Sequence, residues 1–518
     1  MTTHDPSAGS AALAFLDSGH RPPEALPAAD PARLPPVHKR YPSAVRVPLP
    51  PGGAPADDTG PALLSRLLRH TNGITRMRWM SGLMPLGLGG AGAPGDRRVL
   101  LSPGRTAAAS GSRYPVEVYV AHGGTAGAPG GLSHYDPVHH VLERLRDGDG
   151  RARVLAALRT PPARDAESVL LLTSVLWRNA AKYGAFGYRL QSLDVGAVTA
   201  QAAAAAEAAG LAVTVHLDFD DAALDALLGL DPFAESVFAV VTLHREDAPP
   251  VSRATAPAAW DGPLPRAEPG QLSISEVPAM AEAAALHAAV RLSAPGRGGR
   301  FTDRSEPAGS PRHVLPPAGL RLADGFAGRR TVYGFRPGSV PEASLAALLA
   351  AAAAPPPAGA PGADEVPPVR LAAVVQRVPG VETGAHVYDP VGHALVRTRG
   401  ADAVRAVIGA AKSPMLADEC RTATATLVPC GLLREGVERF GDRWYRAQNI
   451  AAGALAQRIA LASAAAGLES HVHCDFDPDG VGSALGLEPG GLQPLVVVTV
   501  GPRSPERTDP QLPLWGTP

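Results

Sequence analysis

The chain has 518 residues, 45% of them hydrophobic, and a formal net charge of −1. This is enough apolar material for two cores, and the near-zero charge excludes a strongly basic surface for nucleic acid or for an anionic membrane. Three cysteines without C-x-x-C spacing, no signal-peptide pattern and no apolar run of membrane-spanning length predict a reduced, cytoplasmic protein without disulfides.

The predicted elements of the first half follow a segment rich in proline and alanine, residues 1–45, which we expect to be extended or partly disordered. Apolar spacing and β-branched alternation then predict, in chain order, a strand at 45–50, a helix at 63–69, a strand at 116–120, a long helix at 187–209 ended by Gly210, a strand at 211–217, a helix at 221–228 and a strand at 237–243.

A bridge rich in proline, alanine and glycine covers residues 246–317 and contains one predicted helix at 277–290. The second half repeats the order of the first, with helices at 320–325 and 344–353, a strand at 369–375, a long helix at 444–466 and strands at 470–474 and 495–500. Both long helices are apolar nearly all round, so we expect them to be buried. The class is α+β, with an antiparallel or mixed sheet flanked by helices.

The order repeats because the sequence repeats. Lys182 to Arg245 aligns without a gap with Arg439 to Pro502, at an offset of 257 residues, and both copies contain Val-His-x-Asp-Phe-Asp and Leu-Gly-Leu-x-Pro. We therefore predict two related domains, residues 46–245 and 318–518, which follow the N-terminal segment 1–45 and are joined by the linker 246–317.

The two copies differ at positions that could react. Lys182-Tyr183 of the first copy is replaced by Arg439-Phe440 in the second. Phenylalanine lacks the phenol that exchanges a proton, and arginine stays charged where the pKa of a lysine can be tuned. We expect the first copy to carry the chemistry and the second to serve as scaffold.

Four motifs in a fixed order carry a family resemblance. They are Ser110–Tyr119, Leu132–Pro137, Lys182-Tyr183-Gly184 with Gly187-Tyr188-Arg189, and Ala327–Phe335. Together they span about Leu63 to Arg503, and in this order they resemble the FMN-dependent nitroreductase superfamily. They are most similar to its SagB-type peptide dehydrogenases, in the two-copy form of thiopeptide pathways.

The resemblance implies two tandem nitroreductase-like domains that form an intramolecular pseudo-dimer around one FMN. Only the second copy has the phosphate arm, Ala327–Phe335, and only the first has the Ser-Gly loop, Ser110–Pro115. Residues 363–368 of the second copy stand where its loop would be, and residues 53–64 of the first copy stand where its arm would be. The resemblance implies that the phosphate is held by Arg329, Arg330 and Thr331, with Gly501 and Arg503, and that the isoalloxazine ring is lined by Ser110, Gly111, Ser112 and Arg113. Thr331 departs from the family's usual serine.

The resemblance also implies a reaction. SagB-type enzymes oxidise azolines in ribosomally made precursor peptides to azoles, beside a cyclodehydratase. A base removes a proton from the ring, a hydride passes to the flavin, and oxygen reoxidises it. The reactive pair falls on Lys182 and Tyr183, and we expect Tyr183 to be the base tuned by Lys182, with the reverse assignment open. An NAD(P)H-dependent reductase of nitro compounds or quinones, and a non-catalytic scaffold, are the alternatives.

Other patterns favour structural interpretations. His471 and His473 fall on one face of a strand, but the first copy has Thr214 and His216 there, so we predict a strand beside the flavin and no metal site. Asp218 and Asp220, with Asp475 and Asp477, are expected to cap short helices. The glycine-rich segment 87–95 lacks the ending of a phosphate-binding loop, and we expect a mobile loop there.

Overall fold

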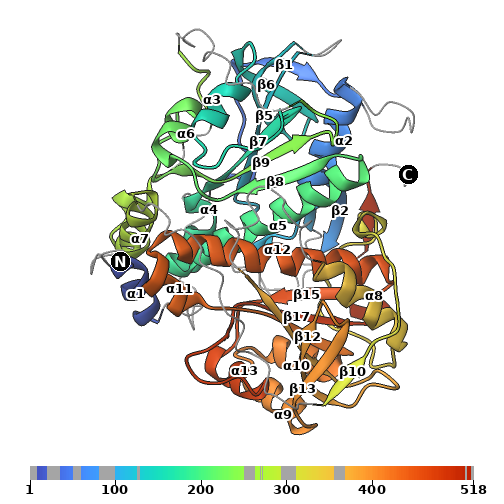
Figure 1. Ribbon diagram of the computed structural model, residues 1–518. Helices are drawn as coiled ribbons and strands as arrows, with labels where there is room; N and C mark the ends of the chain where they lie inside the picture. Colours follow the sequence, from blue (N-terminus) through green and yellow to red (C-terminus); the bar gives the residue numbers. More distant parts are fainter. Residues whose placement is uncertain are drawn as a thin grey trace. The chain divides into compact units, whose positions relative to one another are not determined.

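A computed structural model of the chain is shown in Figure 1. The structure describes residues 9–19, 35–50, 60–80, 100–124, 129–249, 263–268, 270, 272–292, 311–354, 368–507 and 510–514. The chain divides into two compact units. The N-terminal unit consists of Ser10–Pro295 with Gly359–Val366 and Pro510–Pro518, and the C-terminal unit consists of Gly296–Ala358 and Pro367–Asp509 with Met1–Gly9.

The N-terminal unit is built on a seven-stranded antiparallel sheet in the order β1-β6-β5-β4-β7-β9-β8. The strands are β1 (Val45–Pro48), β4 (Val116–His122), β5 (Gly131–Asp136), β6 (Val141–Asp147), β7 (Ser168–Val175), β8 (Ala212–His216) and β9 (Glu235–His244). Every residue of β4, β7 and β9 is buried. The centre of the sheet is therefore covered on both faces.

Helices supply this cover. They are α2 (Gly60–Asn72), α3 (Arg151–Ala156), α4 (Leu176–Tyr183), α5 (Gly187–Ala208), α6 (Asp221–Leu228) and α7 (Ala281–Leu292). Apolar residues of α3 and α6 form one core cluster with Val169 and Leu171 of β7. Because side chains alternate along a strand, Leu170 and Leu172 face the opposite side, where α5 packs (Figure 1). Most of the alanine-rich α5 is buried, as its composition predicts.

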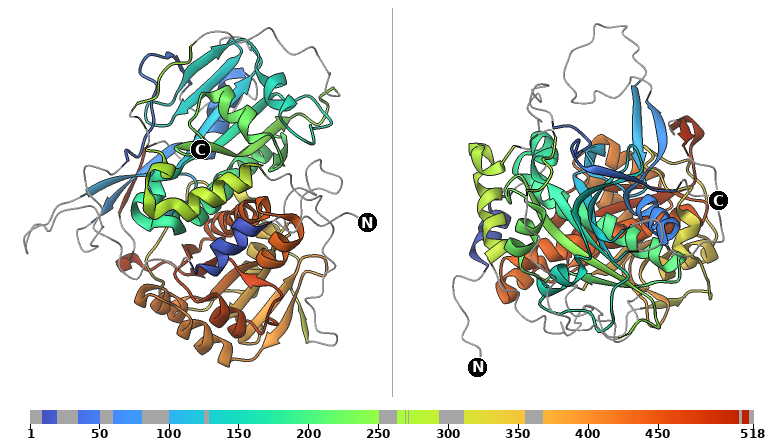
Figure 2. Two further views of the ribbon diagram at one scale, coloured as in Figure 1. Left: turned by 90° about the vertical axis from the view of Figure 1, so that its left-hand side faces the viewer. Right: turned by 90° about the horizontal axis from the view of Figure 1, so that it is seen from above.

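Two parts of this unit differ from the sequence expectation. Residues Ser10–Asp17 form helix α1, although we expected the N-terminal segment to be extended or partly disordered; Phe15 is buried edge-on against the ring of Tyr188. A small sheet of β18 (Gln511–Pro513), β2 (Ile74–Met80) and β3 (Leu100–Arg105) was not predicted at all. Its β2–β3 hairpin extends away from the seven-stranded sheet (Figure 2).

The C-terminal unit repeats the same topology. Its antiparallel sheet has the order β10-β13-β12-β11-β14-β17-β15, and β16 pairs with β14. The strands are β10 (Arg312–Val314), β11 (Arg370–Val375), β12 (Gly384–Asp389), β13 (Ala394–Arg399), β14 (Ala425–Gly431), β15 (Glu469–His473), β16 (Gln493–Pro494) and β17 (Val497–Gly501). Strand for strand, this is the order of the first sheet.

The helices of the second unit also fall in two layers. They are α8 (Glu342–Ala352), α9 (Asp402–Gly409), α10 (Pro414–Thr422), α11 (Leu433–Phe440), α12 (Arg443–Ala465) and α13 (Pro478–Ala484). Residues of α9, α10 and α13 form one core cluster with β11, β12, β14 and β17, and the long α12 packs on β14, β15 and β17. The predicted α+β class with two repeated domains is confirmed.

The short-helix caps are confirmed in part. Asp220 and Asp477 each accept a hydrogen bond from a backbone amide in the first turn of α6 and α13, respectively. Asp218 and Asp475 do not cap these helices; Asp218 pairs with Arg159, and Asp475 accepts from a histidine. The segment predicted as a helix at 320–325 contains a 3-10 turn, Leu322–Gly325. The loop predicted at 87–95 and residues 363–367 lie outside the described residues.

Candidate active site

The lysine–tyrosine pair is placed by the end of a helix. Lys182 and Tyr183 occupy the last turn of α4, which Gly184 ends with a φ of 57° before α5 begins at Gly187. A positive φ of this kind costs glycine little, so the chain can reverse here without strain. The Lys182 Nζ lies 4.9 Å from the centroid of the Tyr183 ring, and both side chains are half-buried.

The Ser-Gly loop is a tight turn between β3 and β4. Its residues Gly111, Ser112 and Tyr114 all have a positive φ, of 57°, 56° and 48°. For residues with a Cβ this conformation costs on the order of 1–2 kcal/mol each. The surrounding structure must therefore hold the loop in place.

The loop and the lysine–tyrosine pair come together at Gly111. A Cβ atom added to Gly111 would lie 2.8 Å from the Nζ of Lys182 and inside van der Waals contact of the Tyr183 hydroxyl. Only a glycine therefore fits between the ends of these two side chains. The structure thus brings together four of the predicted residues that are far apart in sequence: Ser110, Gly111, Lys182 and Tyr183.

An aspartate that the sequence analysis missed fastens this loop. Asp194, in the middle of α5, accepts hydrogen bonds from the backbone amide and the hydroxyl of Ser110, both at 2.9 Å. Its other oxygen accepts from Asn179 of α4 at 3.0 Å. Burial raises the pKa of Asp194 to about 7, and these hydrogen bonds oppose the rise. The carboxyl group therefore links the loop to the helix that carries Lys182 and Tyr183.

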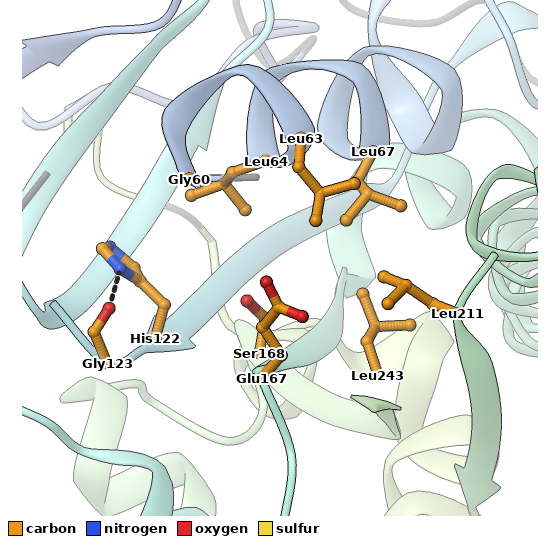
Figure 3. Close-up of a pocket in the computed structure, with 10 residues that line it drawn as sticks. All are labelled: Gly60, Leu63, Leu64, Leu67, His122, Gly123, Glu167, Ser168, Leu211 and Leu243. Atoms are coloured by element: carbon orange, nitrogen blue, oxygen red, sulfur yellow. Dashed lines mark hydrogen bonds between the residues drawn. The ribbon is translucent and has the colours of Figure 1, made fainter. Parts of the chain in front are cut away.

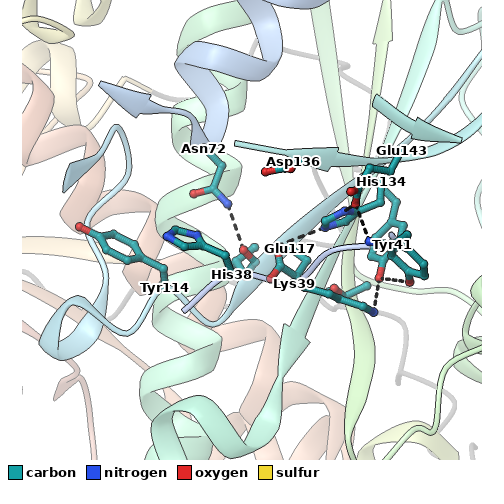
Figure 4. A network of polar contacts seen from close by, with 12 residues as sticks. His38, Lys39, Tyr41, Asn72, Tyr114, Glu117, His134, Asp136 and Glu143 are labelled. Carbon is teal, nitrogen blue, oxygen red and sulfur yellow. Dashed lines mark hydrogen bonds and ion pairs between the residues drawn. The ribbon is translucent and has the colours of Figure 1, made fainter. Parts of the chain in front are cut away.

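A buried ion pair supports the loop at its other end. Its carboxylate belongs to Glu117, which Figure 4 shows beside His134. Arg178 of α4 donates to the backbone carbonyl of Tyr114 at 2.8 Å and pairs with Glu117 of β4 at 2.5 Å. Burial opposes ionisation of Glu117, but Arg178 and then His134 hold its pKa well below its usual range. Removal of one partner from such a buried pair destabilises the folded protein. Arg178 and Glu117 therefore fix the path of the loop into β4.

Hydrogen bonds inside the loop limit how it could contact a flat ligand. The backbone amide of Ser112 donates to Ala109, and that of Arg113 donates to Ser110, while the amide of Ser110 is taken by Asp194. These three amides are not free to bind a ring that the loop would line, because all three already have acceptors within the protein. The Arg113 side chain offers another donor, because its buried Nε has no hydrogen-bond partner among the described residues.

The charge of the lysine is disfavoured at this place. Burial, and then the neighbouring Arg113 guanidinium, lower the pKa of Lys182 from its usual value. A lysine with a lowered pKa is more often neutral near pH 7, and a neutral amine can accept a proton. The electrostatics therefore favour Lys182 as a group that can accept a proton.

The residues of the predicted phosphate arm gather within the C-terminal unit. Thr331 pairs in parallel with Ser470 of β15, and Phe335 pairs with Arg503 just beyond β17. A Cβ on Gly501 would touch the ring of Phe335 at 2.9 Å, so a glycine is required there. The arm thus runs along the ends of β15 and β17.

The two arginines of the arm are in different situations. Arg329 is buried. Arg330 is half-buried and is bound by Glu469 at the start of β15: its Nε donates to a carboxylate oxygen at 2.9 Å, and its Nη2 contacts the same oxygen. The sequence analysis missed Glu469. Its carboxylate orients the guanidinium and leaves Nη1 outside this pair.

A small pocket in the N-terminal unit is lined by other residues. It is a cavity of about 20 Å³, room for roughly one water molecule, between α2 and the ends of the central strands β4, β7 and β9 (Figure 3). Leucines 63, 64, 67, 211 and 243 form most of its wall. None of the predicted site residues lines it, so it has no part in the candidate site.

The nitroreductase family profile matches residues 93–243 and 326–502, which is more than half of the chain. The chain belongs to the nitroreductase family. Its two matched regions fall in the two halves of the repeat, and the resemblance inferred from the motifs is confirmed at the level of the family. No helix among the described residues is long and apolar enough to cross a membrane.

Individual relatives match parts of this nitroreductase-family chain. The trifolitoxin-processing protein TfxB of Rhizobium leguminosarum bv. trifolii is 28% identical over 143 residues, which is 26% of this chain and 38% of TfxB. The nitroreductase-type protein MJ1384 of Methanocaldococcus jannaschii is 30% identical over 119 residues, 23% of this chain and 60% of its own length. The chain thus matches less than two thirds of either relative.

One solved structure resembles the chain over nearly its whole length. The crystal structure of a nitroreductase-type protein from Anabaena variabilis has a TM-score of 0.75, covers 95% of this chain and 99% of its own, and is 22% identical. At that identity the likeness concerns the fold alone.

Proposed function

We propose that this protein is an FMN-dependent dehydrogenase that oxidises azoline rings in a ribosomally made precursor peptide to azoles. The observation that carries the proposal is the meeting of Lys182 and Tyr183 at Gly111, because it places two groups able to exchange a proton against the loop that lines the flavin in similar enzymes. The similarity to TfxB, which processes trifolitoxin, supports a peptide as the substrate.

The residues present fit an FMN cofactor. Gly111 is exposed and cannot carry a side chain without displacing Lys182 and Tyr183, so the loop keeps a flat surface beside the reactive pair. In the C-terminal unit, Arg330 is oriented by Glu469 and Arg503 is exposed. Guanidinium groups suit a phosphate because they make charge-assisted bonds to it. Ser110 to Arg113 would hold the ring, and Arg329, Arg330, Thr331, Gly501 and Arg503 would hold the phosphate.

The division of these motifs supports a composite site. The N-terminal copy has the loop and the Lys-Tyr pair but no Arg-Arg-Thr arm, and the C-terminal copy has the arm but Arg439 and Phe440 at the reactive positions. Each half lacks what the other has, which is the pattern of subunits in a family dimer that share one flavin. The proposal is one FMN for each chain.

The protein's own groups would handle the proton. When bound, the flavin would accept the hydride and pass its electrons to oxygen. The ring carbon that was the Cα of the original cysteine or serine would lose its proton to Lys182 or Tyr183, and aromatisation would drive the loss. The lowered pKa of Lys182 suits the proton acceptor, and the adjacent Tyr183 hydroxyl could relay the proton. Asp194, Arg178 and Glu117 would keep the loop fixed while this happens.

Spectroscopy and mass spectrometry test this function. The purified full chain should be yellow, release FMN on denaturation, and remove two hydrogens from each thiazoline or oxazoline of a model peptide in air. Rapid bleaching by NAD(P)H without mass loss on the azoline peptide would instead support a reductase of nitro compounds or quinones. A colourless protein that binds a cyclodehydratase would support a non-catalytic scaffold.

A further inference from the structure

A second cluster of reactive side chains lies in the C-terminal unit. It joins α10, which packs on β17 (Figure 1), to β15, the strand that pairs with β17. Glu419 of α10 reaches two histidines on one face of β15. One carboxylate oxygen lies 2.9 Å from the Nδ1 of His471, and the other lies 2.8 Å from the Nε2 of His473. The two imidazole rings are 4.0 Å apart between centroids.

The three side chains are enclosed by protein. Glu419 is 1% exposed, His473 is 4% exposed, and the side chain of His471 is partly buried. One nitrogen or oxygen from each residue lies within 4.8 Å of the others. Metal–ligand bonds of about 2.0–2.2 Å place neighbouring ligand atoms roughly 3 Å apart, so a small opening of this cluster would admit an ion.

Outer contacts orient two of the three groups, His473 and Glu419. The Nδ1 of His473 is 3.1 Å from Asp475, which leaves its Nε2 directed at Glu419. The hydroxyl of Thr499 on β17 donates to Glu419 at 2.9 Å. Histidine ligands of metals almost always bind a carboxylate or carbonyl through their second nitrogen, and this contact sets the tautomer.

The N-terminal unit shows what the same strands look like without the cluster. Thr214 replaces His471, and the equivalent of His473, His216, contacts the hydroxyl of Thr242 at 3.2 Å. Asp218, at the position of Asp475, pairs with Arg159 and not with the histidine. In the described N-terminal unit, residues 157–167 between α3 and β7 contain no helix, and the residue 257 positions before Glu419 is Pro162. The cluster is therefore not required to build this pair of strands.

We propose that Glu419, His471 and His473 bind one divalent transition-metal ion of the zinc class. Two imidazoles and a carboxylate are a ligand set that suits such ions, and three protein ligands leave the fourth position for water. The assignment replaces our sequence expectation of no metal site, which considered the two histidines without Glu419.

The site lies directly behind the arm. On β15, Glu469 binds Arg330 two residues before His471, and Ser470 pairs with Thr331 one residue before it. The ring of Tyr333 meets His471 edge-on at 5.3 Å. An ion that joins α10 to β15 would hold the strand against which the arm is built.

The test is a zinc titration of the tag-free full chain after treatment with EDTA and dialysis, in competition with a chromophoric chelator. The wild type should bind one Zn²⁺ for each chain. Glu419→Gln and His471→Asn should abolish this binding, and Asp475→Asn should weaken it by about 10- to 100-fold. His216→Asn, the matched change in the other unit, should leave it unaltered. Equal zinc uptake by the wild type and Glu419→Gln would overturn the proposal.

Two further measurements use the wild type, so they test the site even if the variants do not fold. Zn²⁺ should raise the thermal unfolding temperature of the EDTA-treated wild type, since a ligand that binds only the folded state stabilises it. X-ray absorption at the zinc edge should show nitrogen and oxygen neighbours and no sulfur, whose bond would be about 2.3 Å long. An unchanged unfolding temperature at saturating zinc, or a sulfur ligand from Cys474, would contradict the site.

Discussion

Asp194 binds Ser110 twice, through the backbone amide and through the hydroxyl, both at 2.9 Å. The two residues are 84 positions apart, and the contact joins the centre of a buried helix to the loop beside Lys182 and Tyr183. A carboxyl group in this position acts by positioning the loop, because its hydrogen bonds go to Ser110 and Asn179.

The first prediction concerns the pH dependence of stability. The folded-state pKa of Asp194 is raised to about 7, whereas an unfolded aspartate has a pKa of about 3.9. Between about pH 4 and pH 7, the folded protein therefore keeps a proton that the unfolded chain has already released. The stabilisation is complete below about pH 4 and is lost as the pH rises through about 7. Urea unfolding at a series of pH values should show this slope in the wild type.

Asp194→Asn should reduce that slope, because an amide does not titrate. The matched control is Asp225→Asn, which removes another buried carboxyl group whose pKa burial raises to about 6, in the same unit but away from the loop. Both variants should lose part of the slope, but only Asp194→Asn should slow the oxidation. An unaltered slope in Asp194→Asn would show that the carboxyl group is ionised in the folded protein.

The second prediction concerns Gly111. Gly111→Ala should reduce azoline oxidation by at least about 100-fold, because the new Cβ collides with Lys182 and Tyr183. It should also lower the free energy of unfolding by about 1 kcal/mol through its positive φ. Gly210→Ala is the control: Gly210 has a φ of 69°, and nothing lies within 4 Å of the added Cβ. Steady-state oxidation and urea unfolding of both variants separate the collision from the backbone strain.

If Gly210→Ala loses as much activity as Gly111→Ala, the loss comes from general destabilisation. If Gly111→Ala keeps full activity, Lys182 and Tyr183 do not need the position against the loop that the structure gives them.

Much of the fold could be predicted from the sequence because it depends on local patterns. The long α5 and α12 follow from their apolar composition, and the caps at Asp220 and Asp477 follow from residue type and position. The small third sheet could not be predicted, because it pairs Gln511 with Arg78 across most of the chain. No local signal encodes a contact of that kind.

The candidate site was predictable only where a motif names it. Lys182, Tyr183 and the Ser-Gly loop were found in this way. Asp194 was missed because the helix was interpreted as apolar nearly all round; an acidic residue between Leu193 and Val195 was the available signal. Glu469 and Glu419 were missed for another reason: their partners, Arg330 and the two histidines, lie 139 and about 50 residues away in sequence.

The third prediction separates the two candidate bases. Tyr183→Phe and Lys182→Met should each lower the rate of azoline oxidation by about 10²- to 10⁴-fold, the usual contribution of a positioned acid or base. Both should retain the flavin spectrum, because neither residue is part of the proposed phosphate or ring contacts. In single-turnover oxidation as a function of pH, the variant that lacks the true base should lose the acidic limb, which is the rise in rate as the base is deprotonated.

Phe440→Tyr, the matched change in the second copy, tests whether that copy is only scaffold. It should leave the rate unaltered. A Tyr183→Phe variant that still converts thiazoline to thiazole at the wild-type rate would remove Tyr183 from the mechanism and leave Lys182 as the base.

The last prediction concerns Arg330. Arg330→Ala should weaken FMN binding by roughly 10- to 150-fold, since a hydrogen bond to a charged group contributes about 1.5–3 kcal/mol. The variant also leaves Glu469 buried without its partner, so stability should be measured with it; Arg330→Ala combined with Glu469→Gln removes that second effect. Arg321→Ala is the control, because Arg321 is an exposed arginine of the same unit that pairs only locally with Asp324. Equilibrium dialysis measures the affinity for FMN of the wild type and of these three variants. Lys182 and Tyr183 belong to the other unit. A cofactor shared by the two halves requires that FMN is lost in Arg330→Ala and in the double variant but retained in Tyr183→Phe. Full FMN occupancy in Arg330→Ala would place the phosphate elsewhere.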